Sequence, residues 1–448
     1  METDSKRILI LCSTTPNRLK YGSHLILTTL LGLKVELTTN KSEYECYVGA
    51  KLQYATQRII PGGIFIYNSG FLEKTGIEQF EPDLEKKQHF PLLFPTVNSE
   101  CILGFDIFAA SFYLVSRYEE YQQGSKDLHG RFMAEESFAY RHGFLDIPLV
   151  NHYAWRLKKV LQHHFPFLVF KVPDYNFIPT YDIDVAYAYR GRDLIRGLGA
   201  TIRSMSKFDF DSVSERIMVL GGKRQDPFDT YEMQFNWQKK YGFESYYFFL
   251  CGKKGPRDHN ISSNSKAFKK LVNTICKKAR IGIHPSYASA NNSKLMAAET
   301  ASLSKIAGKQ INLSRQHYLK FTLPETYRLL IQNNIIGDFS MGYASLPGFR
   351  ASIATPFLFY DLKSEEPTSL TIYPVAVMDG TLKDYMNLTT AQAISKISEI
   401  IAEVRKVNGT FISLWHNDSL SERSRWTGWR KVYELLLEMA AQNIKTEA

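Results

Sequence analysis

Two carboxylates, Asp182 and Asp184, stand two residues apart in the stretch FIPTYDID (177–184), where a short apolar run ends. Side chains two apart in an extended strand point to the same face, so both acids could reach one metal ion or one substrate. A pair of solvated loop acids or helix caps would give the same pattern. The pair therefore gains meaning only from other residues that could share a cavity with it.

Polar or ionisable residues end nearly every apolar run of strand length in the second part of the chain. The runs are FIPTYDID, SYYFFLC, RIGIH, INLSRQHY, IGDFSM, TIYPVAVMD and TFISLWH. Their ends carry Asp182, Asp184, His284, Arg315, His317, Asp338, Asp379, His416, Asn417 and Asp418. In a β/α barrel the carboxyl ends of the strands meet at one mouth, where the active site is built.

Each of these residues has a chemical and a structural interpretation. As neutral imidazoles, His284 and His317 suit Zn, Fe, Co or Ni, and each could equally be a satisfied structural histidine. Arg315 would hold a neighbouring carboxylate ionised, or form a surface salt bridge. His416 suits a general acid because imidazole titrates near neutral pH, or it caps a carbonyl. As a set, acids, histidines and an arginine indicate metal-assisted hydrolysis.

The motifs of several large enzyme classes are absent from the sequence. It contains no G-x-S-x-G, Walker loop, G-x-G-x-x-G or H-E-x-x-H. This excludes the common serine hydrolases, P-loop enzymes, dinucleotide-dependent oxidoreductases and zincins.

Composition indicates a soluble protein, for which we expect a cytoplasmic location. The net charge of +10 is spread along the chain with acids among the bases, so we expect no nucleic-acid partner. The five cysteines form no C-x-x-C and are odd in number, which argues against a disulfide framework and a cysteine zinc site. No run of roughly 18 apolar residues predicts a membrane span, and ILILC near the N-terminus is too short for a signal peptide.

The order of elements predicts an α/β protein of two domains. Residues 1–172 read as a smaller mixed α/β domain, with helices over 105–123 and 151–165 and three prolines shortly after. From 173 to 448 the seven runs alternate with helical stretches such as 265–279, 324–334 and 388–409. This alternation predicts parallel strands with helical crossovers, in a seven-unit (β/α) barrel or in an open doubly wound sheet.

Five short motifs over residues 173–448 resemble, in order, those of the polysaccharide deacetylases, the NodB-homology carbohydrate esterases. They are TYDID, IGIHPSY, RQHY, DFSMGY and LWH. The resemblance implies an irregular seven-unit (β/α) barrel and a divergent bacterial member with an extra N-terminal domain of unknown role. It implies Asp182 as catalytic base, with Arg315 as the group that orients it and Asp338 as support. It implies Asp184 and His284 as metal ligands and His416 as general acid. Tyr318 would line the site, and Leu414 would lie in the pocket for the acetyl methyl.

The sequence departs from the family pattern at one metal ligand. The second family motif is H-x-x-x-H, whereas Ala288 stands four residues after His284. Catalytic zinc sites usually keep three protein ligands, so we expect His317, which occupies the place of a family proline, to supply the third.

Other residues are candidates for contact with the substrate. Arg350 in GFRAS is a rival arginine for substrate or base, and residues 190–240 are expected to form a helical cover at the barrel mouth. The candidates for sugar stacking are Tyr343, Phe349, Trp415 and Trp426, each of which could equally be an ordinary core or rim aromatic.

We therefore expect a metal-dependent carbohydrate deacetylase that removes an acyl group, foremost N-acetyl, with Zn as the first choice of metal and Co, Ni or Fe as alternatives. One alternative is a catalytically degenerate member that binds carbohydrate or a partner protein, which the loss of a ligand at Ala288 favours. Another is an amidohydrolase acting on a small non-sugar amide. The sugar and the oligomeric state are not predicted.

Overall fold

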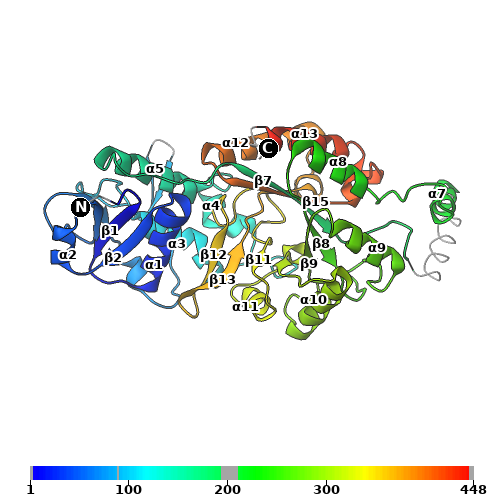
Figure 1. Cartoon of the computed structure of the whole chain (residues 1–448), viewed down its shortest axis with the longest axis horizontal. Coiled ribbons are helices and arrows are strands. Elements are labelled where there is room, and N and C mark those ends of the chain that lie inside the picture. Colours follow the sequence, from blue (N-terminus) through cyan, green and yellow to red (C-terminus); the bar gives the residue numbers. More distant parts are fainter. Residues whose placement is uncertain (1–3, 88–89, 193–209, 443–448) are drawn as a thin grey trace.

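The computed structural model describes residues 4–87, 90–192 and 210–442. Its first part is built on a parallel sheet in the order β2-β1-β3-β4 (Figure 1). From Ile8 onward β1 is buried at every position, as expected for a parallel strand covered on both faces. The strands are β1 (Arg7–Cys12), β2 (Lys34–Thr38), β3 (Ala50–Ala55) and β4 (Ile64–Tyr67), and a separate antiparallel pair is β5 (Leu84–Lys87) and β6 (Phe90–Leu93).

Helices pack on this first sheet and beside it. The long helix α5 carries a row of buried residues that includes Leu149, Tyr153, Leu157 and Leu161, spaced by about one turn. The helices are α1 (Asn17–Ser23), η1 (His24–Leu30), α2 (Lys41–Cys46), η2 (Phe71–Glu73), α3 (Ile107–Val115), η3 (Tyr118–Tyr121), η4 (Ala134–Glu136), α4 (Phe138–Arg141) and α5 (Leu149–His164).

The second part is built on a larger sheet in the order β12-β13-β11-β10-β9-β8-β7-β15-β14. Neighbouring strands are parallel except for β12, which pairs antiparallel with β13. The strands are β7 (Asn176–Ile183), β8 (Tyr246–Leu250), β9 (Arg280–His284), β10 (Leu313–Ser314), β11 (Gly337–Asp338), β12 (Phe357–Asp361), β13 (Glu366–Ile372), β14 (Val377–Met378) and β15 (Thr410–His416).

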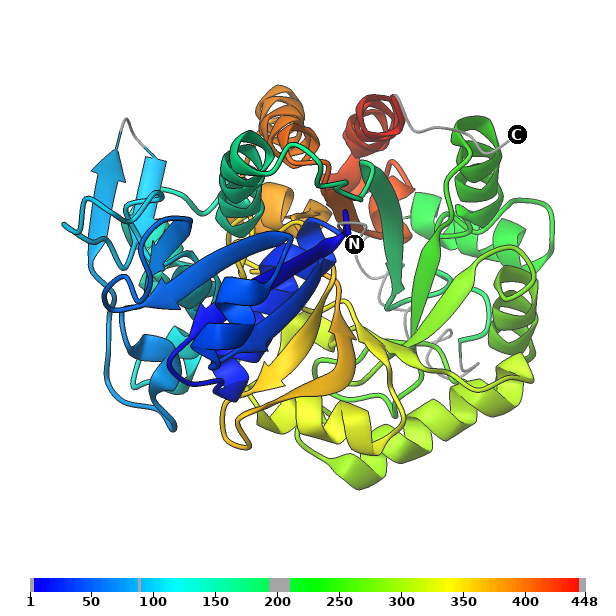
Figure 2. The ribbon, with the colours of Figure 1, turned by 60° about the vertical axis from the view of Figure 1, so that its left-hand side comes forward.

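Helices lie around the outside of the second sheet (Figure 2). The one that precedes β15 begins with a capping box, in which Thr389 and Gln392 satisfy each other's backbone N–H groups. The helices are α7 (Phe210–Leu220), α8 (Tyr231–Tyr241), α9 (Lys266–Ile275), α10 (Ser293–Ala307), η5 (His317–Leu319), α11 (Glu325–Gln332), η6 (Thr381–Tyr385), α12 (Thr390–Lys406), η7 (Asp418–Leu420), η8 (Ser424–Trp426) and α13 (Trp429–Ala441).

All seven runs expected to be strands contain one, but two details differ from expectation. The run 371–379 belongs to two strands that are not neighbours, because β13 pairs with β11 whereas β14 pairs with β15. The helix expected over 105–123 ends at Val115, because Arg117 has a left-handed backbone with φ 55° before the short turn η3.

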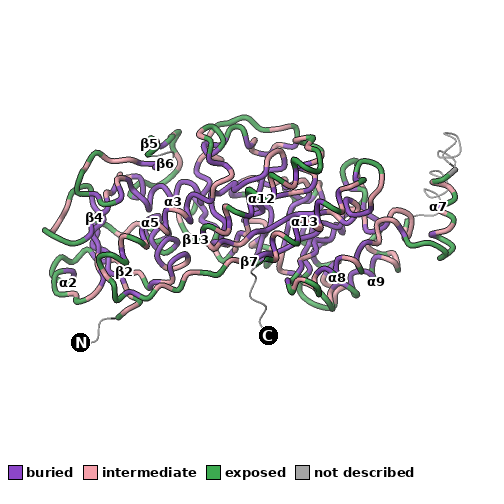
Figure 3. The backbone as a smooth tube through the Cα atoms, turned by 90° about the horizontal axis from the view of Figure 1, so that it is seen from above, coloured by how far each residue is buried: buried purple, intermediate pink, exposed green. Residues whose placement is uncertain are grey.

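The two parts share one hydrophobic core. A single cluster of buried apolar side chains runs from Ile8 in β1 to Ala440 in α13. Buried segments accordingly continue from α3 and α5 across to β13 (Figure 3). Within the described residues, no helix is both long and apolar enough to span a lipid bilayer.

A buried ion pair and a buried hydrogen bond also join the two parts. Arg350 donates through Nε and Nη2 to the two carboxylate oxygens of Glu120, at 2.8 and 2.6 Å. Arg117 donates to the hydroxyl of Tyr343 at 2.9 Å. These four side chains are almost completely buried, so the junction is a fixed contact.

Candidate functional site

A cavity of about 520 Å³ opens at the carboxyl ends of the strands in the second sheet. It is lined by Arg131, Asp182, Asp184, Val185, Arg257, His259, His284, His317, Tyr318, Leu319, Ala344, Met378, Gly380, Asp384, Tyr385, Leu414, His416, Asp418, Arg425 and Trp426. The strand ends therefore bring residues from 182 to 416 together, as the sequence predicts.

Strand register sets the positions of the main polar groups. In the parallel pair of β7 and β15, His416 is opposite Asp182, and two residues earlier Leu414 is opposite Thr180. Asp184 lies in the bend just beyond β7. Because alternate residues share a face, Thr180, Asp182 and Asp184 can all be directed to the same side of the sheet.

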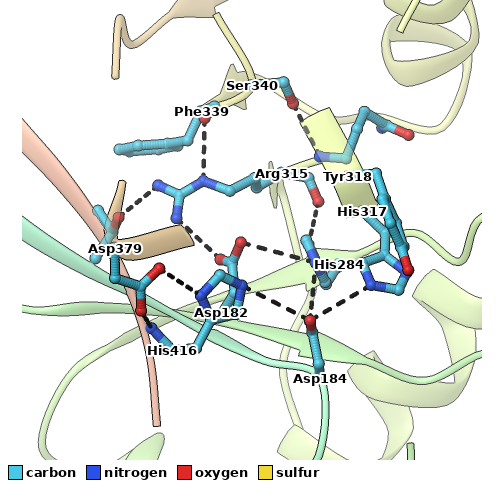
Figure 4. Close-up of polar contacts among 12 residues, drawn as sticks. Asp182, Asp184, His284, Arg315, His317, Tyr318, Phe339, Ser340, Asp379 and His416 are labelled. Carbon is cyan, nitrogen blue, oxygen red and sulfur yellow. Dashed lines mark hydrogen bonds and ion pairs between the residues drawn. The ribbon is translucent and has the colours of Figure 1, made fainter. Parts of the chain in front are cut away.

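Asp182 is held by Arg315 (Figure 4). The Arg315 guanidinium donates to Oδ1 of Asp182 at 2.9 Å, to Oγ1 of Thr180 at 2.5 Å and to the carbonyl of Phe339 at 3.0 Å. Both charged side chains are buried. Such a buried, hydrogen-bonded ion pair fixes the orientation of the Asp182 carboxylate.

His416 is held by a carboxylate to which the sequence assigns no role, that of Asp379. Nδ1 of His416 lies 2.8 Å from Oδ1 of Asp379, and the backbone N–H of His416 donates to Oδ2 at 2.8 Å. Nε2 is then the nitrogen that faces the other site residues, 3.7 Å from Asp184. Burial by itself lowers the pKa of His416, but Asp379, Asp184 and Asp182 outweigh burial and hold it well above its usual value.

Asp184, His284 and His317 form a group with the composition of a metal site. One candidate ligand atom from each lies within 4.8 Å of the others. Nε2 of His284 is 3.2 Å from Oδ1 of Asp184, and Nε2 of His317 is 3.4 Å from Oδ2 (Figure 4). His317, the residue expected to supply the third ligand, therefore lies close enough to Asp184 and His284 to bind the same metal ion.

The second nitrogen of each histidine ring supports this interpretation. Nδ1 of His284 lies 2.6 Å from the carbonyl oxygen of Arg315, and Nδ1 of His317 lies 2.9 Å from Oδ1 of Asp258. Because both partners are acceptors, each Nδ1 donates away from the cluster, and Nε2 is the nitrogen of each ring that faces Asp184 and is available to a metal. Ligating histidines are usually oriented in this way.

The charges in this group favour a bound cation. Two imidazole Nε2 atoms face one carboxylate, and Oδ1 of Asp184 is buried without a hydrogen-bond partner. Burial by itself lowers the pKa of His317, but Asp184 and Asp258 outweigh burial and raise it to about 9. Without a metal, a positive charge on His317 offsets these carboxylates, and a divalent ion with Asp, His and His ligands would supply that charge instead.

Not every predicted contact residue lines the cavity. Tyr318, Leu414 and Trp426 line it. Trp415 is fully buried, with its ring 4.8 Å from that of Tyr433, because odd-numbered residues of β15 face away from the site.

Three further candidates lie elsewhere. Tyr343 and Arg350 belong to the buried contact with Arg117 and Glu120, which uses their polar groups, and Phe349 is a core residue. The structure thus places Tyr343 and Arg350 at the junction between the two parts and not in the cavity where the sequence placed them.

Asp338 supports the site indirectly. Its carboxylate accepts from Ser314 and from the backbone and hydroxyl of Ser340, and Ser340 in turn accepts from the backbone N–H of Gln316. Burial, opposed by these hydrogen bonds, raises the pKa of Asp338 to about 6. Arg315 is contacted directly by Thr180 and the carbonyl of Phe339, and His416 by Asp379, so Asp338 supports the site at one remove.

The helical cover expected over residues 190–240 does not line the cavity where it is described. Residues 193–209 lie outside the described residues, and α7 projects from one end of the molecule (Figure 1). Glu215 of α7 pairs with Arg423, beyond the residues that line the cavity.

One family model matches the N-terminal part of the chain. It is described as a family of unknown function, DUF7033, and it covers residues 8–166. None of the curated proteins compared with the chain matches it.

Several solved structures show distant similarity to the chain. A protein from Mycobacterium smegmatis assigned to the polysaccharide deacetylases is 13% identical with a TM-score of 0.40, over 62% of this chain and 87% of that one. A polysaccharide deacetylase from Bacillus cereus is 11% identical with a TM-score of 0.28, over 59% and 86%. A 4-alpha-glucanotransferase from Thermococcus litoralis is 12% identical with a TM-score of 0.36, over 61% and 38%. Because these scores are low, the case for a function rests on the geometry of the site.

Proposed function

We propose that the protein is a metal-dependent hydrolase that removes an acyl group, foremost N-acetyl, from a carbohydrate. The observation that carries this proposal is the arrangement around one cavity of a His–His–Asp cluster, an Asp182–Arg315 pair and an Asp379–His416 pair. These supply a metal site, a base and an acid. Metal-assisted amide hydrolysis uses each of the three.

The metal would be held by Asp184, His284 and His317, with Zn as the first choice and Co, Ni or Fe as alternatives. When bound, a divalent metal lowers the pKa of a water molecule and polarises a carbonyl group. Asp258 and the carbonyl of Arg315 hold the two histidine rings in the orientation that binding requires.

Asp182 is the proposed general base. Oδ1 is engaged by Arg315, which leaves Oδ2, 3.7 Å from Nε2 of His284, beside the metal site. In that position Asp182 can accept the proton of the attacking water while Arg315 keeps the carboxylate aimed. The backbone N–H near Tyr318 is a candidate donor to the developing oxyanion.

His416 is the proposed general acid. Asp379 binds Nδ1, so that a proton on Nε2 is available to the leaving amine at the cavity wall. Leu414, two residues earlier on the same face of β15, offers an apolar surface for the acetyl methyl group. Tyr318 and Trp426 are aromatic candidates for contact with the sugar ring.

We further propose that the second sheet and its helices correspond to an irregular β/α barrel over residues 173–448, preceded by a domain over residues 1–172. The parallel order of β7 to β11 and the helices on the outer side of the sheet support this architecture. All five cysteines are free, which supports the expected reducing, cytoplasmic location.

The experiment that tests this function measures acetate released from N-acetylglucosamine oligomers or from a nucleotide-linked N-acetyl sugar, with Zn or Co added. The wild type should release acetate, and Asp182→Asn should reduce kcat by about 10²–10⁴-fold because the base is lost. Asp211→Asn, on the exposed surface of α7, is the matched control and should keep wild-type activity.

Two outcomes would contradict the proposal. Full activity in Asp182→Asn, with its metal content unchanged, would overturn the assignment of the base. Tight binding of the sugars without any acetate release by the wild type would favour a carbohydrate-binding protein that has lost catalysis.

A further inference from the structure

A loop of the N-terminal part reaches the cavity. Asp127 organises this loop, because its Oδ1 accepts from the backbone N–H groups of His129 and Arg131, both at 2.9 Å. Its own N–H donates to the carbonyl of Arg131 at 3.0 Å, and Gly130 has φ 76°, which suits glycine. The loop is therefore a compact turn that presents Arg131 to the cavity.

The Arg131 side chain connects three groups at the cavity wall. Nε donates to Oδ2 of Asp127 at 2.7 Å, Nη1 to the carbonyl of Tyr318 at 2.7 Å, and Nη2 to the hydroxyl of Tyr385 at 3.2 Å. The residue is only 7% exposed. A planar guanidinium can make all three bonds at once, whereas an ammonium group cannot reproduce this fork.

The carbonyl that Arg131 binds belongs to a strained turn. Tyr318 and Leu319 have φ of 63° and 50°, a left-handed conformation that is unfavourable for residues with a side chain. Such a turn persists only when its surroundings hold it in place. The preceding residue is His317, whose ring centroid lies 4.5 Å from that of Tyr318.

A second residue of the same loop packs on this turn. The His129 ring centroid is 5.0 Å from that of Tyr318, and its Nδ1 is 3.2 Å from the hydroxyl of Tyr287. The N-terminal loop thus contacts both the backbone and the side chain of the turn that follows the metal-site histidine.

We propose that the N-terminal part is an integral wall of the active site, and that Arg131 is a positioning residue for the turn that carries His317 and Tyr318. The inference rests on the proposed metal-dependent function. It assigns a role to the segment that the family of unknown function covers, residues 8–166: a loop of this segment supports the turn that follows a metal-site histidine of the neighbouring sheet.

Titration of the full-length, metal-free protein with Co²⁺ tests the proposal, by calorimetry and by the visible absorption of the bound ion. Arg131→Ala should weaken Co²⁺ binding by about 10–100-fold and alter the spectrum, as expected when a group that supports a ligand is lost. Arg131→Lys, which keeps the charge without the fork, should fall between this variant and the wild type. Arg141→Ala is the control, since Arg141 pairs with Glu81 on the exposed surface of the same part of the chain.

Equal Co²⁺ affinity and identical spectra in Arg131→Ala and Arg141→Ala would overturn the positioning role. If Arg131→Ala does not fold, the same Co²⁺ titration of Arg131→Lys tests the proposal. Wild-type affinity and spectrum in Arg131→Lys would then contradict it. Failure of the proposed function is distinguishable, because it would appear as Co²⁺ binding by the wild type without acetate release.

Discussion

At the scale of single residues, the site consists of pairs in which one group holds another. Arg315 holds Asp182, Asp379 holds His416, and Asp258 holds His317. The residue that would meet the substrate or the metal is in each case the second of the pair. Substitutions at the holding residues should therefore weaken individual steps without removing the reacting group.

His317 is the residue on which metal binding depends most clearly, because Ala288 provides no ligand. We expect His317→Ala to abolish stoichiometric metal in the purified protein, since Asp184 and His284 alone leave two protein ligands. Elemental analysis of purified variants measures this. His163→Ala, an exposed histidine of the N-terminal part, should retain the wild-type content. One metal ion per chain in His317→Ala would show that another group completes the site.

The role of Asp379 can be tested by varying the leaving group. We expect Asp379→Asn to reduce kcat on an N-acetyl sugar by about 10²–10³-fold, because His416 is no longer held and stabilised as the proton donor. An activated aryl acetate, whose leaving group needs no proton, should lose less than about tenfold. An equal loss on both substrates would indicate that Asp379 supports the site as a whole and not the acid.

At the scale of elements, the close spacing of the central strands depends on Gly282 in β9. A Cβ at this position would lie 2.6 Å from the Phe248 ring and 2.8 Å from the carbonyl oxygen of Leu313. The same phenylalanine ring lies 4.5 Å from the guanidinium carbon of Arg315. A larger residue in β9 would therefore affect both packing and the arginine that holds Asp182.

Gly282→Ala should lower the free energy of unfolding by about 1–3 kcal/mol, the usual cost of overpacking a well-filled core. Urea unfolding followed by circular dichroism measures this change. Gly124→Ala is the control, because a Cβ there meets only Phe132 at 3.9 Å and its φ is not left-handed. Wild-type stability in Gly282→Ala would show that β9 can move without cost.

The sequence predicts the elements that position the site better than it predicts the contacts between them. The strand ends at Asp182, His284 and His416 follow from apolar runs that stop at polar residues, and the structure brings them together. The role of Asp258 could not be predicted in this way, because Asp258 lies in a loop within the basic stretch CGKKGPRD, where it resembles a solvated charge.

At the scale of the whole molecule, the junction between the two parts could not be predicted from the sequence. Tyr343 and Arg350 resemble substrate-binding residues because aromatic and cationic side chains near strand ends are common in sugar sites. Their partners, Arg117 and Glu120, are more than 200 positions away in the chain. No periodicity in the sequence reveals such a pairing, so only the structure separates these residues from the site.

The junction should make stability depend on acid pH. Burial by itself raises the pKa of Glu120, but Arg350 and Arg117 outweigh burial and lower it to about 2, from 4.5. A lowered pKa in the folded state stabilises the protein above the unfolded value, and this contribution is lost as the pH falls from about 4.5 towards 2.

Glu120→Gln should therefore lower the free energy of unfolding at pH 7 by about 3–5 kcal/mol, the cost of breaking a buried ion pair. It should also show a smaller loss of stability between pH 5 and pH 3 than the wild type. Thermal and urea unfolding across this pH range measure both effects. Glu78→Gln, which removes an exposed pair with Lys74, serves as the control. Equal stability of the two variants at pH 7 would contradict this account.

The register that sets His416 opposite Asp182 also has a consequence for the site: the reacting groups are positioned by strands, and other residues at the cavity come from other parts of the fold. The distance between the proposed acid and base is fixed by backbone hydrogen bonds inside the sheet. Arg257 and His259 reach the same cavity from a loop, and Arg425 and Trp426 from the short helix η8. Such segments can be exchanged or lengthened while the strands keep their spacing. The scaffold could therefore be retargeted to a different acylated compound by replacing these connections alone, with its reaction chemistry left in place.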